Sequence, residues 1–179
     1  MRFKRIMAAA VVAGVVAAGG AAAVAGQNAP ARLGEFASWR AAQKAAGFML
    51  LMPGRTYGQA RSNKIIVTRC EQGGKVSKHL LVVATYGRKP TAGFTIGQSN
   101  SGSTCALTGK SRRLAKVVLH GVTAILSGEC GMHGMPSCTS TRIYLFLTWQ
   151  RHGIGYLATS YGERPKVLLG FARALKPVG

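Results

Sequence analysis

The sequence predicts an α+β domain, with a mainly antiparallel sheet of about six or seven strands and an N-terminal and a C-terminal helix on one face. Three observations predict this class. Short apolar runs of strand type follow one another between glycine turns. No helical segment separates these runs, which favours antiparallel pairing. Helical periodicity is found only near the two ends of the domain.

The first predicted helix covers residues 35–46. Phe36 and Trp39 are spaced i, i+3 on one face, and Gly47 is a typical C-terminal stop. A short apolar strand at 48–52 is expected to follow it.

The middle of the chain carries the remaining strand signals. The predicted strands are 64–70, 79–86, 93–98, 116–119, 122–126, 142–149 and 154–160. The run 142–149 is apolar at consecutive positions, so we expect both of its faces to be buried inside the sheet. The segment 109–113 is expected to be a loop.

The second predicted helix covers residues 165–175. Val167, Leu168, Phe171 and Leu175 fall on one apolar stripe at helical spacing. Proline is tolerated in the first turn of a helix, which suits a start at residue 165.

The N-terminus has the three parts of a secretory signal. A basic start precedes an apolar run of Ala, Val and Gly, which closes at Ala23-Val24-Ala25. We therefore predict a signal peptide at 1–25, a flexible lead-in at 26–34 and one globular domain at 35–179. Cleavage would make the protein secreted or extracytoplasmic in the cell envelope, whereas retention would leave residues 6–25 as a membrane anchor.

The cysteine count suits an oxidising compartment. Four cysteines, Cys70, Cys105, Cys130 and Cys138, allow three pairings, among which the sequence alone does not choose. We predict Cys130–Cys138, because these two bracket a Gly/Pro-rich turn between strands, and Cys70–Cys105 then remains. The competing interpretation is a metal site formed by Cys130, His133 and Cys138, which lacks an evident fourth ligand and is disfavoured for exported thiols.

The charge balance excludes several classes of enzyme. Three of the 24 basic residues lie in residues 1–25, which leaves 21 against four glutamates, a net charge of +17, and the chain has no aspartate. An Asp-oriented triad, an aspartic dyad and an EF-hand loop are therefore impossible. Neither a G-x-S-x-G elbow nor an H-E-x-x-H motif is present. We expect a non-catalytic protein without a cofactor or a resident metal.

The positive charge also suggests a partner. A field of this size attracts anionic wall polymer, anionic lipid or nucleic acid. Lys110, Arg112 and Arg113 form the densest basic cluster and are the predicted polyanion contacts. The alternative is that the charge reflects only composition and solubility.

A second kind of partner is a protein, for example a protease. Met132, His133 and Met135 lie in the turn between Cys130 and Cys138, and a stapled loop loses little entropy on docking. The leading interpretation is a secreted, non-catalytic cell-envelope domain that binds or senses something. Two more specific versions of this interpretation are polyanion binding and protein binding through this loop.

Four short patterns occur together between residues 45 and 175. They are Ala45-Ala46-Gly47-Phe48, Gln98 after Phe94-x-Ile96, Trp149-x3-Gly153-x2-Tyr156, and a final helix with Leu168, Phe171 and Leu175. In these the chain resembles a bacterial extracytoplasmic domain family of unknown function, some members of which sit on anti-sigma-factor-like proteins. The resemblance implies a curved antiparallel sheet, flanking helices and a binding or sensing role. The four cysteines and the strong positive charge depart from it.

Overall fold

The computed structural model describes residues 33–61, 64–72, 75–88, 92–103, 105, 111–130, 137 and 143–179. The predicted signal peptide and most of the predicted lead-in lie outside these ranges. The described elements are β1 (Gly34–Phe36), α1 (Trp39–Ala46), β2 (Leu51–Pro53), β3 (Ile65–Gln72), β4 (Lys75–Arg88), β5 (Ala92–Ser99), β6 (Arg112–Leu119), β7 (Val122–Glu129), β8 (Tyr144–Arg151), β9 (Ile154–Tyr161), α2 (Pro165–Arg173) and β10 (Leu175–Pro177).

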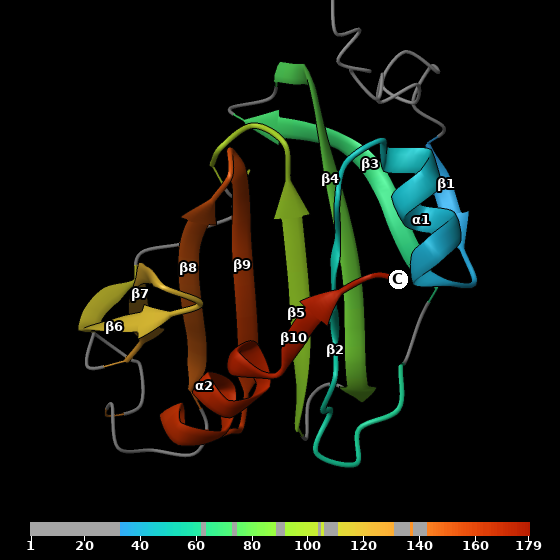
Figure 1. The fold of residues 1–179 in the computed structure, drawn as a ribbon. Coiled ribbons are helices and arrows are strands. Elements are labelled where there is room, and N and C mark those ends of the chain that lie inside the picture. The colour runs from blue at the N-terminus through green and yellow to red at the C-terminus, as the bar shows by residue number, and fades with distance from the viewer. Residues whose placement is uncertain are drawn as a thin grey trace, which may run out of the picture.

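The fold is built on one large antiparallel sheet (Figure 1). Eight strands follow the order β1-β3-β4-β5-β9-β8-β7-β6, and β2 and β10 form a separate pair. The predicted class is therefore right, whereas the predicted count of six or seven strands is too low. β8 lies inside the sheet between β7 and β9, and Phe146 on its second face is 8% exposed.

The first helix begins later than predicted. Residues 34–36 form β1, which pairs with β3 so that Glu35 lies opposite Ile66. Ser38 then caps the helix, because its hydroxyl accepts a hydrogen bond from the Ala41 amide at 3.2 Å. α1 therefore starts at Trp39 and stops at Gly47, which has a left-handed φ of 74°.

The second helix ends earlier than predicted. α2 runs from Pro165 to Arg173, and Leu175 already belongs to β10. The apolar stripe continues to Leu175 because that side chain is buried in the same core as the helix. The 3.6-residue spacing therefore did not mark where the helix stops.

One face of the large sheet carries the core. A ladder of facing residues crosses five strands, and its members are 0–4% exposed. These residues are Leu126, Leu147, Ala158, Ile96 and Ala84. In Figure 1 both helices and the β2–β10 pair lie on the side of the sheet that faces the viewer.

Aromatic side chains join the helices to this face. Phe171 of α2 is fully buried and stacks on Phe94 of β5, with ring centroids 4.5 Å apart and an interplanar angle of 6°. The indole N–H of Trp39 in α1 donates to the Tyr86 hydroxyl at 3.0 Å. Each helix therefore has at least one specific anchor on the sheet.

Two glutamines hold β2 in place. Gln98 is 0% exposed; its Oε1 accepts from the Leu51 amide at 2.7 Å, and its Nε2 donates to the Leu51 carbonyl at 2.6 Å. Gln43 of α1 accepts from the neighbouring Leu50 amide at 2.8 Å. The Gln98 side chain thus replaces a neighbouring strand for Leu51, whose partner in β10 is Pro177, a residue without an N–H.

Candidate functional site

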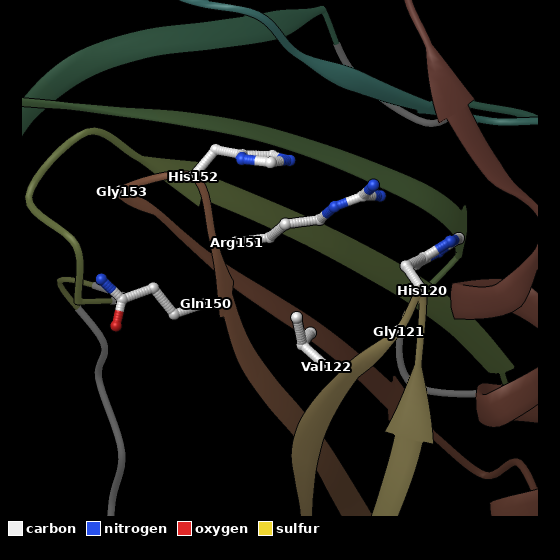
Figure 2. Close-up of a pocket in the computed structure, with 7 residues that line it drawn as sticks. All are labelled: His120, Gly121, Val122, Gln150, Arg151, His152 and Gly153. Atoms are coloured by element: carbon white, nitrogen blue, oxygen red, sulfur yellow. The ribbon is translucent and has the colours of Figure 1, made fainter.

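A cationic groove lies between the tips of two hairpins. It has a volume of about 520 Å³ and is open to solvent. Its lining residues are His120, Gly121, Val122, Gln150, Arg151, His152 and Gly153. Figure 2 shows the side chains of His152, Arg151 and His120 extending in the same direction from the two tips. No acidic residue lines the groove, so nothing in it neutralises the positive charge of Arg151. The Arg151 guanidinium can therefore donate hydrogen bonds to a ligand.

Both tips are two-residue turns with the same sequence, which we call the His-Gly turns. His120-Gly121 joins β6 to β7 and His152-Gly153 joins β8 to β9. Both residues of each turn are left-handed, with φ of 50° and 79° in the first and 50° and 74° in the second. This is the pattern of the type I′ turn, the tight connection that matches the twist of paired strands.

The two tips separate because one hairpin bends. β7 pairs with β8 only from Ile125 to Glu129, and the β6–β7 hairpin runs across the direction of β8 (Figure 1). Its tip is fastened to the C-terminal turn of α2, where Nε2 of His120 lies 2.9 Å from the Ala172 carbonyl oxygen. A carbonyl only accepts, so Nε2 carries the hydrogen and donates it. The groove is the space left between this tip and the end of β8.

An aromatic pair lies close to Arg151. Trp149 and Tyr156 face each other in β8 and β9 and stack with centroids 5.1 Å apart. Both belong to the core, with exposures of 4% and 5%. Burial raises the pKa of Tyr156, and the nearby charge of Arg151 opposes that rise. The pair is therefore part of the core and is not an exposed stacking platform for a ligand.

Few of the described basic side chains have an acidic partner. Sixteen lysines and arginines have described side chains, and all four glutamates of the chain are described as well. Among these residues the single ion pair joins Lys64 to Glu35 at 3.6 Å, with both side chains more than 60% exposed. The side chains of Arg151 and His152 have neither a hydrogen bond nor an ion pair to any described residue, and both are exposed to solvent.

The predicted polyanion cluster is only partly described. Arg112 and Arg113 are exposed at the start of β6, so the predicted loop at 109–113 is wrong for these two positions. Lys110 lies outside the described residues. His120 follows the other end of β6, so Arg112 and Arg113 are separated from the groove by the length of the strand.

The described cysteines are all oxidised. Cys70 and Cys105 are bonded to each other, with Cα atoms 5.5 Å apart. Cys130 is fully buried and disulfide-bonded. Its predicted partner, Cys138, lies outside the described residues, so that pairing stays a prediction.

The predicted partner loop cannot be placed, because Met132, His133 and Met135 lie outside the described residues. The same holds for the His133 ligand of the alternative metal site. Within the described ranges, no group of three or more His, Cys, Asp or Glu is arranged to hold a metal ion.

Sequence reasoning missed the groove residues Arg151, His152 and His120 as a group. The available signal is the His-Gly dipeptide, which occurs at 120–121, 133–134 and 152–153 and is followed by Val or Ile at the first and the last of these places. It predicts two equivalent turns, but not that they face each other.

Among the described residues, no helix is long and apolar enough to cross a membrane. No protein-family model, no curated protein and no solved structure matches this chain.

Proposed function

We propose that this chain is an exported, non-catalytic domain that docks on an anionic polymer of the cell envelope. The observation that carries the proposal is the unpaired positive charge. All four carboxylate side chains are accounted for, yet only Lys64 among sixteen described basic side chains lies within 4.0 Å of one. A surface charged in this way gains counterion-release free energy on a phosphate-rich polymer.

The arrangement of the fold supports a docking role. One side of the sheet is covered by the two helices and the β2–β10 pair (Figure 1). All sixteen described basic side chains are exposed to solvent. The signal pattern at 1–25 and the oxidised cysteines suit an extracytoplasmic location, where envelope polymers are accessible. The family that the chain resembles implies a binding or sensing role as well.

A sedimentation assay with purified bacterial envelope tests the proposal. The oxidised protein is mixed with envelope at salt concentrations from 50 to 300 mM, with and without reductant. Envelope from which the anionic polymers have been extracted is the matched control. We expect binding that falls steeply with salt, is indifferent to reductant and is lost on the extracted envelope.

The opposite pattern identifies a different function. Binding that changes little with salt but disappears with reductant would favour a disulfide-stapled loop that docks on a protein. Equal binding to intact and extracted envelope, or none to either, would contradict the polymer as the partner.

A further inference from the structure

We infer that the groove between the two His-Gly turns is a phosphate-binding site that grips single phosphate groups of the polymer. This inference rests on the proposed function and assigns it a location. The ligand is identified by its chemistry as a tetrahedral anion with several charged oxygens.

The donors in the groove suit such an anion. The guanidinium of Arg151 presents paired N–H groups in a planar fork, which binds two oxygens of a phosphate at once. The imidazoles of His152 and His120 extend in the same direction from the two hairpin tips (Figure 2). A phosphate presents its oxygens tetrahedrally, so donors can reach it from several directions at once, whereas a carboxylate presents its two oxygens in one plane. The Nε2–H of His120 is already bonded to the Ala172 carbonyl, so the free donors are the Arg151 fork and the His152 imidazole, and these suit the tetrahedral oxygens of a phosphate better than a planar carboxylate.

The groove has no negatively charged side chain that would repel an anion. Its seven lining residues include no carboxylate, and Gln150 contributes a neutral amide that is exposed. Arg151 keeps its donors free because it makes no ion pair with a described glutamate. The positive charge of Arg151 is therefore not neutralised by any other residue that lines the groove.

The backbone at the two tips has the conformation of tight type I′ turns. The described part of the chain has four non-glycine residues with positive φ, and two of them are His120 and His152. Histidine is, with asparagine and aspartate, one of the non-glycine residues that adopt this conformation most often. Histidine in both turns places an imidazole at each tip; that of His120 is bonded to Ala172, and that of His152 is free to donate.

The groove is also held in position before a ligand arrives. The hydrogen bond from His120 to Ala172 fixes the bent hairpin on α2, and the buried Trp149–Tyr156 pair supports the strand end that carries Arg151. Its volume of about 520 Å³ lies within the roughly 300–1,000 Å³ of ligand sites. Because the groove is open to solvent, a polymer can cross it while one phosphate is bound.

The test compares matched arginine substitutions in the full oxidised protein. Arg151→Gln removes the groove fork, and Arg164→Gln makes the identical change at an exposed position that precedes α2. His152→Asn removes one imidazole while keeping a residue favoured in the left-handed turn. Thermal unfolding of each variant checks that the fold is retained. Binding is measured by fluorescence anisotropy with labelled polyphosphate.

We expect Arg151→Gln to weaken polyphosphate binding about tenfold or more, the value of one charge-assisted hydrogen-bonded contact. Arg164→Gln is expected to weaken it less than about threefold, because a single screened surface charge contributes little. His152→Asn is expected to weaken binding without lowering the unfolding temperature. Polyglutamate is expected to compete more weakly than polyphosphate.

The failures of the two proposals are distinguishable. If wild-type protein binds polyphosphate but Arg151→Gln and Arg164→Gln lose affinity equally, the charge acts diffusely and the groove is not the site. Equal competition by polyglutamate would overturn the choice of phosphate. Equal displacement by inorganic phosphate, at the same phosphate concentration, would show that the free ion and not the polymer is the ligand. No binding by the wild-type protein at low salt would overturn the proposed function itself.

Discussion

Replacement of Gln98 by methionine tests how the β2–β10 pair is fastened to the large sheet. Methionine has a similar length and volume but has neither the amide donor nor the carbonyl acceptor. In the substituted protein the amide and the carbonyl of Leu51 would both lose a buried partner. β10 does not replace it, because Leu50 and not Leu51 faces that side: the Leu50 carbonyl accepts from the Val178 amide, and the backbone polar groups of Leu51 point the other way.

The magnitude follows from these two bonds. A buried polar group left without a partner costs about 1–3 kcal/mol, so two such groups cost about 2–6 kcal/mol. Gln43→Met is the matched control, since Gln43 is only partly buried and accepts one hydrogen bond, from Leu50. That change is expected to cost about 1 kcal/mol. A typical domain has only about 5–15 kcal/mol of stability, so the difference is easily measured.

Urea denaturation of the oxidised proteins provides the measurement, with the free energy of unfolding taken by linear extrapolation. Gln98→Glu is a second variant for the same measurement, because a carboxylate accepts from the Leu51 amide but cannot donate to the Leu51 carbonyl. We expect Gln98→Glu to be at least as costly as Gln98→Met. A loss below about 1 kcal/mol for Gln98→Met, or a loss no larger than that of Gln43→Met, would refute the role assigned to Gln98.

Three further predictions concern the core and its strands. Phe171→Ala is expected to cost about 3–5 kcal/mol in urea denaturation, because the ring is fully buried against Phe94; a cost under about 1 kcal/mol would mean that α2 is not docked through it. Burial raises the pKa of Tyr156 above the ordinary tyrosine value of 10.0, so the stability that this group contributes is complete below that pH and falls as the pH rises further; Tyr156→Phe should flatten this loss between about pH 9 and 12, and an unchanged profile would contradict it. Gly155→Ala places a Cβ 2.3 Å from the Ser103 carbonyl oxygen and is expected to lower stability by about 1–3 kcal/mol, whereas Gly97→Ala, whose nearest contact is 3.7 Å, serves as the tolerated control; equal effects would contradict the close approach.

The sequence predicted the elements whose signal is local. Alternating or continuous apolar runs located β3 to β9 to within a few residues, because each strand buries one face of a sheet. The pair Cys70–Cys105 followed from the choice of Cys130–Cys138. β1 and β10 were missed because three-residue strands have too little pattern, and each exists only through pairing with a distant segment, β3 or β2.

The groove could not be predicted for a related reason. Its existence depends on the bend of the β6–β7 hairpin and on the contact between His120 and Ala172, which are 52 residues apart. The two His-Gly turns are visible in the sequence, but whether their tips face each other depends on strand order. The basic cluster that the sequence did emphasise, Arg112 and Arg113, lies at the far end of β6.

The salt dependence of binding to a defined phosphate polymer tests the central claim most directly. Association constants of the wild-type protein with polyphosphate are measured from 50 to 300 mM salt, and the slope of log K against log salt concentration is taken. Each neutralised phosphate of a single-stranded polymer contributes about −0.7, so contacts with four or more phosphates predict a slope of about −3 or steeper. A slope shallower than about −1, or no measurable binding at 50 mM salt, would contradict the account of this domain as a polyanion-binding module.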